Sequence, residues 1–175
     1  MERALLATPG RPDEPAVTAK PRLDRTAFAG LVARYQPDLL RVGYVILGDA
    51  ALAEDAAQAA WIQAWRKLHQ LRDDGKLRSW LVAVAANEAR QIARKRRRFP
   101  SQAASDGFAA EADPRLADLA AALARLTPDD RRLIGLRYVA GLTSDEIGEA
   151  VGISGGAVRH RLMRLLADLR KELAV

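Results

Sequence analysis

Cysteine is absent from the 175 residues, which excludes disulfides, cysteine-based zinc sites and thiol chemistry. Histidine occurs only at His69 and His160, which argues against a histidine metal cluster or a histidine-centred catalytic site. No run approaches the roughly 18 apolar residues of a membrane span, and the N-terminus lacks a secretory signal pattern. Lys and Arg number 28 against 22 Asp and Glu. We therefore expect a cytoplasmic, basic, soluble protein with a polyanionic partner, without cofactor, metal or membrane insertion.

Two stretches lack a sustained helical pattern of apolar residues. Residues 1–24 carry four of the eight prolines. Because proline removes a backbone donor and restricts its neighbour, we expect a disordered arm there. Residues 100–117 are rich in Ser, Ala, Asp and Gly and are mainly acidic, which predicts a flexible linker. Two modules remain, residues 25–99 and 118–175.

Both modules show apolar residues at three- and four-residue steps, and neither shows the alternation of a β-strand. In the first module, Pro37 is expected to interrupt the helical pattern before Leu39 resumes it. Gly48 is expected to end that segment. The sequence therefore predicts an all-α fold of two small helical domains joined by the flexible linker.

The caps and glycines of the second module predict a helix-turn-helix. One capped helix precedes a very short helix that opens with a capping box, and a third capped helix follows a glycine turn. Gly148 is expected to let the last two helices cross closely. The boundary residues are Thr127, Pro128, Gly141, Thr143, Glu146, Gly152 and Ser154.

The third helix of this motif is expected to bury Val158, Leu162, Leu165 and Leu169 and to turn a cationic face outward. Such a helix fits the major groove of DNA, where arginines contact guanine or phosphate. The alternative is a small helical bundle whose arginines are only solvated. The candidate DNA-reading residues are Ser154, Arg159, His160, Arg161 and Arg164.

A second basic cluster ends the first module, with Arg90 and the run from Arg94 to Arg98. Such a run can be a solvated helix end, but beside a DNA-reading module we favour a stripe that binds phosphates. Upstream lie a guanidinium, an indole and two amides, groups that read or stack on exposed bases. Trp80 could equally be a core residue. These upstream candidates are Arg78, Trp80, Asn87 and Gln91.

The preceding helix carries the opposite charge. Its polar, partly acidic face is unsuited to phosphate and is expected to meet a protein. An ordinary solvated face, with both tryptophans in the core, remains open. The residues are Asp49, Glu54, Asp55, Gln58, Trp61, Gln63 and Trp65.

The order of these parts resembles bacterial sigma factors. The segments that resemble their core-binding and promoter-melting domain are Ala53–Gln58, Trp61–Leu68, Arg78–Leu81 and Ala85–Asn87. The segments that look like their promoter-reading fourth domain are Leu126–Pro128, Leu136–Tyr138, Gly141–Thr143, Glu146–Gly148 and Val158–Leu162. Two domains with no third between them resemble the extracytoplasmic-function (ECF) group of the sigma-70 family.

The resemblance implies a transcription initiation factor and no enzyme. The helix Asp49–Leu68 would dock on the β′ clamp helices of core RNA polymerase, and the β flap region and an anti-sigma factor are further implied partners. The segment around 71–78, including Lys76, and the helix with Asn87, Arg90, Arg94 and Lys95 would hold the melted −10 element. The helix-turn-helix would read the −35 element of promoter DNA.

Three positions depart from the family pattern. Ala59 follows Gln58 where Glu is usual, Gly155-Gly156 opens the reading helix, and His160 often has a small counterpart. We expect these changes to affect core binding and promoter preference. A rival reading is a stand-alone helix-turn-helix regulator, which the melting-domain residues argue against. A second rival reading is a serine recombinase. Its catalytic domain would need strands and a nucleophilic serine among clustered arginines, and Ser79 is the only serine in the first hundred residues.

Overall fold

The computed structural model describes residues 24–71, 73–98 and 114–173, and nearly all of the expected arm and most of the expected linker lie outside these ranges. The described part is helical and contains no strand, as predicted. The α-helices are α1 (Arg25–Leu47), α2 (Ala50–Lys67), α3 (Leu77–Arg98), α4 (Pro114–Arg125), α5 (Pro128–Ile134), α6 (Ser144–Val151) and α7 (Gly155–Glu172). Short 3₁₀ turns cover Leu68–Gln70 and Asp74–Lys76, and a π-helical turn, Gly135–Val139, extends α5.

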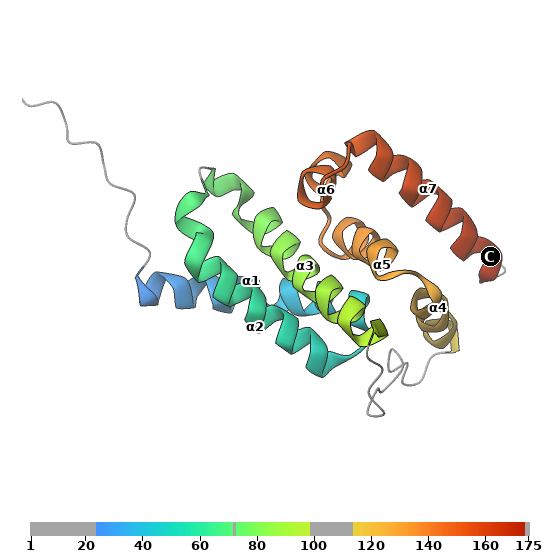
Figure 1. The fold of residues 1–175 in the computed structure, drawn as a ribbon, viewed down its shortest axis with the longest axis horizontal. Helices are drawn as coiled ribbons and strands as arrows, with labels where there is room; N and C mark the ends of the chain where they lie inside the picture. Colours follow the sequence, from blue (N-terminus) through green and yellow to red (C-terminus); the bar gives the residue numbers. More distant parts are fainter. Residues whose placement is uncertain (1–23, 72, 99–113, 174–175) are drawn as a thin grey trace, which may run out of the picture.

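Helices α1, α2 and α3 pack together as a three-helix group (Figure 1). The prediction that Pro37 interrupts the first helix is wrong, because α1 runs unbroken through it. An interior proline costs a helix about 3 kcal/mol. Packing of residues on both sides of it offsets this cost: Phe28 lies against the tryptophans of α2, and Leu39 is fully buried. Gly48 ends α1 in the left-handed conformation (φ 71°), as expected.

The buried faces of α2 and α3 consist mainly of alanine. Small side chains let helix backbones approach closely, and α1 makes one such close approach to α2 at Gly43. A Cβ atom on Gly43 would lie 3.2 Å from the Cβ of Ala53. The buried alanines are Ala53, Ala56, Ala57, Ala60, Ala64, Ala85, Ala86, Ala89 and Ala93.

Helices α5, α6 and α7 form the predicted helix-turn-helix. The capping box at the start of α6 is present, and its hydrogen bonds from Thr143 hold the pKa of Glu146 below its ordinary value of 4.5. A Cβ on Gly148 would lie 2.6 Å from the carbonyl oxygen of Ile153, so the close crossing requires glycine there. Gly152 turns the chain with φ 80°, and Ser154 caps α7. The four leucine and valine positions predicted to face inward on α7 are buried.

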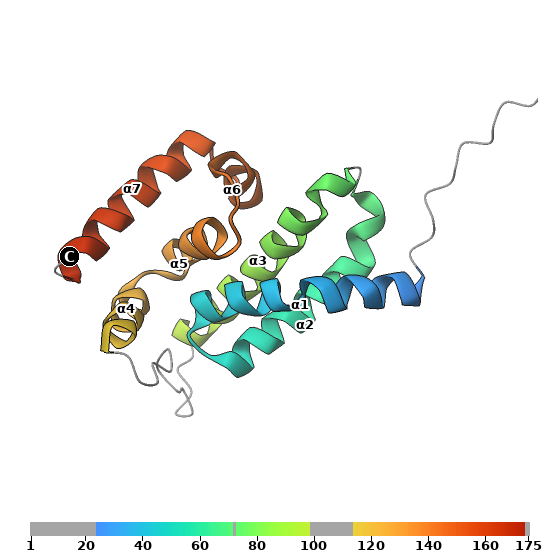
Figure 2. The same ribbon diagram turned by 180° about the vertical axis from the view of Figure 1, so that it is seen from behind.

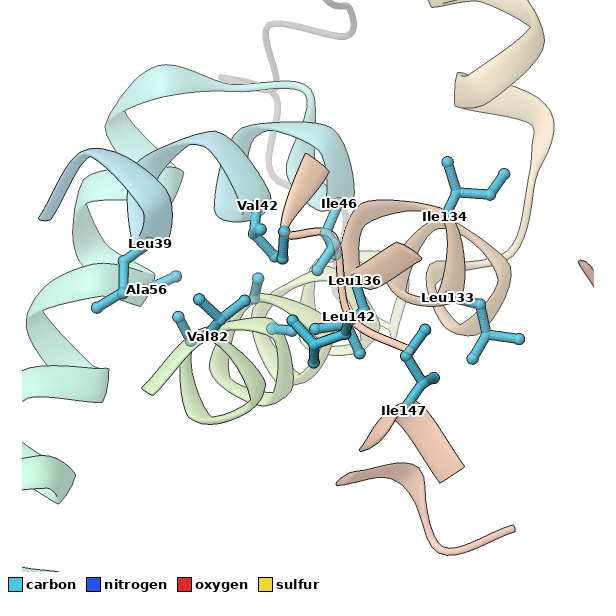
Figure 3. Close-up of a cluster of buried hydrophobic side chains, with 14 of the residues drawn as sticks. Leu39, Val42, Ile46, Ala56, Val82, Leu133, Ile134, Leu136, Leu142 and Ile147 are labelled. Atoms are coloured by element: carbon cyan, nitrogen blue, oxygen red, sulfur yellow. The ribbon is translucent and has the colours of Figure 1, made fainter. Parts of the chain in front are cut away.

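The two helical groups share one continuous core (Figure 3). Leu136 and Leu142 of the second group, α4–α7, lie toward Val42 and Ile46 of α1 and Val82 of α3 (Figure 3). Helix α5 lies beside α3, as Figures 1 and 2 show from opposite sides, while α7 lies on the outer side of the second group. We call this the closed arrangement. The expected linker overlaps α4, which already begins at Pro114.

None of the helices in the described ranges combines the length and apolar character that a bilayer crossing requires. The same ranges contain no group of three or more His, Asp or Glu side chains that could hold a metal ion.

Candidate nucleic-acid interface

Helix α7 presents most of its predicted DNA-reading residues to solvent. Arg159 is exposed and lies 3.7 Å from the carboxylate of Asp145, while His160 and Arg164 are exposed. Ser154 uses its hydroxyl to cap the helix, accepting a hydrogen bond from the amide of Ala157 at 3.1 Å. A capped N-terminus facing solvent can enter the major groove.

Arg161 differs from its neighbours because it turns back toward α5. Its Nε donates to Asp130 at 2.8 Å, and both side chains are partly buried. A guanidinium held by a carboxylate in this way is positioned by the protein and is less available to a base edge. The sequence placed Arg161 with the outward residues, but the structure turns it inward against α5, through a contact that lies within the second group.

Helix α3 contributes the second cationic surface. Arg94 and Lys95 are exposed on its last turns. Arg90 is half-buried and pairs with Asp129 at the start of α5, and this hydrogen bond is the main cause that lowers the pKa of Asp129 below 3.8. Gln91 is exposed and donates to Glu88 at 3.3 Å. Asn87 is half-buried beside Arg90 in a cavity between the two groups.

The remaining residues proposed to hold melted DNA are also engaged within the chain. Arg78 donates to Asp38 at 2.9 Å and to the carbonyl oxygen of Ala140 at 2.7 Å, which ties α3 to the second group. Lys76 reaches Glu149 of α6 at 3.1 Å, with both side chains exposed. Trp80 is half-buried and packs against the core, which agrees with the alternative that it is a core residue.

Helix α2 carries the polar face expected to meet a protein. Glu54, Asp55 and Gln58 are exposed. Trp65 is 48% exposed although its ring contacts Phe28 edge-on at 4.9 Å. These four side chains can contact a partner without any rearrangement of the described residues.

Three other members of that predicted set have structural partners. Trp61 is buried and its indole nitrogen donates to Gln36 at 2.6 Å, so it supports the face from within. Gln63 donates to Glu88 of α3. Asp49 caps α2 by accepting from the amide of Leu52 at 3.1 Å. The polar face therefore contains fewer of the predicted residues than the sequence indicated.

Sequence reasoning missed the partners of the arginines. Asp129 and Asp130 read as favourable charges at a helix N-terminus. In the structure one pairs with Arg90 of α3 and the other with Arg161 of α7. Two adjacent carboxylates thus connect one cation from each predicted DNA-binding surface. No local pattern in the sequence signals this, because both contacts join residues more than thirty positions apart.

Two family models match the chain, and together they cover most of it. The model for Sigma-70 region 2 matches residues 31–99, and the model for Sigma-70, region 4 matches residues 116–169. The first range contains α2 and α3 with the polar face and the basic helix. The second contains the helix-turn-helix.

Similar proteins point the same way. The chain is 34% identical to RNA polymerase sigma factor CarQ of Myxococcus xanthus, over 85% of this chain and 94% of CarQ. It is 32% identical to the probable RNA polymerase sigma factor RfaY of Xanthomonas campestris, over 84% of this chain but only 40% of that protein. Other relatives, from Bacillus subtilis among others, bear the name ECF RNA polymerase sigma factor.

A solved structure shares the fold. It is the sigma factor RpoE in complex with the anti-sigma factor NepR from Bartonella quintana, with a TM-score of 0.69, 25% identity, and coverage of 85% of this chain and 97% of that one. The matched domains, their order and these relatives agree with the resemblance drawn from the motifs. The chain belongs to the ECF group of the sigma-70 family of RNA polymerase sigma factors, the proteins that direct transcription initiation.

Proposed function

We propose that this sigma factor divides its work among three surfaces. The first is the polar face of α2, formed by Glu54, Asp55, Gln58 and Trp65, which docks on the β′ clamp helices of core polymerase. What supports this is the exposure of these acidic and polar side chains next to a half-exposed indole. Aromatic residues are enriched at protein interfaces, whereas carboxylates would repel phosphates. Ala59, beside Gln58, is half-buried and lies at the edge of this face.

The other two surfaces bind promoter DNA. The α3 surface, with Asn87, Arg90, Gln91, Arg94 and Lys95, holds the melted −10 element together with Lys76, Arg78 and Trp80 near its start. The α7 surface, with Ser154, Arg159, His160, Arg161 and Arg164, reads the −35 element while the second group meets the β flap region. The observation that carries the proposal is the separation of charge: exposed cations lie on α3 and α7, and the acidic face lies on α2.

Promoter recognition by this chain requires the closed arrangement to open. Positions −35 and −10 are separated by about 25 base pairs, or roughly 85 Å of duplex at 3.4 Å per base pair. In the closed arrangement, Arg90 of the α3 surface pairs with Asp129 of α5 and so ties that surface to the second group, whereas the Arg161–Asp130 pair lies within the second group. Both elements therefore cannot be engaged until α3 and α5 part.

An anti-sigma partner that holds the closed arrangement fits this requirement. RpoE, whose fold matches across 85% of this chain, was solved in complex with an anti-sigma factor. A protein that binds only the closed arrangement shifts the population away from promoter binding by its differential affinity. We propose that an inhibitor of this kind acts on the present chain.

Separation-of-function variants test the division of labour. The measurements are co-purification with bacterial core RNA polymerase and run-off transcription from a promoter library. Arg159→Ala should reduce promoter-dependent transcripts and leave core binding intact. Glu54→Ala combined with Gln58→Ala should reduce both. Arg170→Ala, an exposed arginine in the last turn of α7, is the matched control and should change neither.

Loss of core binding in the Arg159 variant would contradict the assignment of α7 to DNA. Full activity of the double α2 variant would contradict the docking face. Retained affinity for duplex DNA without any binding to core would favour a regulator that acts alone.

A further inference from the structure

A cavity of about 440 Å³ lies between the two helical groups. Its walls come from α3, α5, α6, the turn after α6 and α7, so it is complete only in the closed arrangement. Pockets for small molecules are commonly about 300–1,000 Å³. The cavity is thus large enough for a small ligand. Its lining shares Asn87, Arg90 and Arg161 with the proposed DNA-binding surfaces and shares no residue with the docking face of α2.

The lining of this cavity is cationic. Arg90, Arg132 and Arg161 reach it from three different helices, and Asn87 adds an amide. Among the described residues that line the cavity, Asp129 is the single acidic side chain, and it pairs with Arg90. Arg161 pairs with Asp130, which lies outside the lining, so three guanidinium groups stand against two carboxylates and leave an excess of one positive charge. Guanidinium forks match the oxygens of phosphate, to which they donate paired hydrogen bonds.

Arg132 is a buried cation with incomplete pairing. Arg132 is only 7% exposed, and one of its terminal guanidinium nitrogens donates to the carbonyl oxygen of Ala150 at 3.0 Å. Its Nε has no hydrogen-bond partner among the described residues. Burial, and then the nearby Arg90, lowers the pKa of Arg132 below its ordinary value, and Asp129 opposes this only in part. A buried charge without a counter-ion is costly, and an anion in the cavity would reduce that cost.

We propose that the cavity binds a small anion carrying two or more phosphate groups, of the pyrophosphate or nucleoside polyphosphate class. Three separated guanidinium groups suit several phosphates better than one. A small molecule is favoured over a nucleic acid strand because the cavity exists in the arrangement that must open for promoter recognition. Since the ligand contacts both groups, its binding stabilises the closed arrangement, about 100-fold at a concentration 100 times its Kd.

The test is isothermal titration of the full chain with pyrophosphate, and separately with GTP, in phosphate-free buffer of about 0.15 M ionic strength, where exposed charges are screened. Ile153→Glu places a carboxylate at the cavity wall from a residue that is 40% exposed, so folding should be retained. Met163→Glu, at a residue 65% exposed that does not line the cavity, makes the same change in net charge and is the matched control.

We expect saturable binding that Ile153→Glu weakens about tenfold or more, as a like charge near the ligand should. Met163→Glu should change Kd by less than about twofold, because its carboxylate would lie in solvent outside the cavity lining, where salt screens exposed charges. Equal binding of both probes would identify the phosphates as the recognised part. Stronger binding of GTP would indicate that the nucleoside is recognised as well.

A second pair of variants tests the buried arginine. Arg132→Gln should abolish binding, whereas Arg131→Gln should not. Arg131 is 9% exposed and its Nε also lacks a partner among the described residues, but it does not line the cavity. If Arg132→Gln does not fold, as judged by circular dichroism, the Ile153 and Met163 pair decides the question.

Three results would overturn the proposal. The first is no binding of either probe at millimolar concentration. The second is equal weakening by Ile153→Glu and Met163→Glu, which would indicate attraction to net charge alone. The third is binding of a short single-stranded oligonucleotide, sensitive to Ile153→Glu, without binding of pyrophosphate. None of these measurements involves polymerase, so their failure would leave the proposed function untouched.

Discussion

Gly135 lies where the second helical group meets α1, and it offers a direct way to open the closed arrangement. A Cβ atom on this glycine would lie 3.6 Å from a methyl group of Val45 and 3.7 Å from one of Val42. These are ordinary contact distances, so alanine fits. Leucine adds three more carbons in the direction of α1, and they have no space unless the two groups move apart.

The size of the effect follows from overpacking. Extra methylene groups in a packed core cost about 1–3 kcal/mol. Because the strain of Gly135→Leu exists only while α5 faces α1, opening relieves it. A change of 1–3 kcal/mol shifts a two-state equilibrium by about 5- to 150-fold. Gly135→Ala should not favour opening, since it fills space at normal distances and replaces glycine within a helical segment.

Energy transfer between two dyes measures the opening. The chain has no cysteine, so Ala51→Cys on α2 and Ala167→Cys on α7, both exposed, give unique attachment sites. Gly135→Leu should lower the transfer efficiency of the free protein, with helix content unchanged by circular dichroism. Gly135→Ala should match the parent. Unchanged transfer in the leucine variant would refute the view that this contact holds the two groups together.

Three further changes test the local architecture and the ion pair. Gly148→Ala should destabilise the second group by about 1–3 kcal/mol in thermal unfolding, because the new Cβ would lie 2.6 Å from the carbonyl oxygen of Ile153. Gly30→Ala should not lower stability, because a Cβ atom on Gly30 would meet nothing within 4 Å. Equal losses of stability at Gly30 and Gly148 would contradict the packing argument. Thr143→Ala should lower stability by about 1 kcal/mol through loss of the α6 cap, and Thr143→Ser should keep the cap and the stability. An alanine variant as stable as the parent would show that the cap does not stabilise the fold. Asp129→Asn should weaken closure by about 0.2–1 kcal/mol at neutral pH, as expected for a partly exposed pair. Because the pKa of Asp129 is lowered in the folded chain, its contribution is present above the ordinary value of 3.8 and is lost as pH falls through the lowered pKa. A difference between parent and variant that did not shrink as the pH was lowered below 3.8 would argue against this origin.

The helix-turn-helix could be predicted almost residue by residue because its signals are local. Thr143 and Glu146 are three positions apart, and Gly148, Gly152 and Ser154 follow within eight. Each is required by a turn, a cap or a close crossing inside one short segment, so its chemistry can be read without knowing what packs against the segment. The structure confirms each of these features.

Pro37 shows where local signals fail. Proline lowers helix stability wherever it occurs in a helix interior, and the sequence gives no measure of the packing that opposes it. That packing comes from α2 and α3, which are distant along the chain. The same limit applies to Trp61, whose indole reaches Gln36 across twenty-five positions and is thereby removed from the docking face.

The contacts between the two groups lay beyond sequence reasoning for a related reason. Gly135 interrupts an apolar helical run, and judged from the sequence it is only a residue that weakens a helix by about 0.5–1 kcal/mol relative to alanine. Its position acquires a meaning once α1 is seen within 4 Å of it. Likewise, Asp129 and Asp130 favour a helix N-terminus in any fold, but only the closed arrangement brings Arg90 to the first of them. We have proposed that this sigma factor separates these groups to reach both promoter elements. On that proposal the polar contacts that hold it closed should be weak, and the partly exposed ion pair between Arg90 and Asp129 meets that condition.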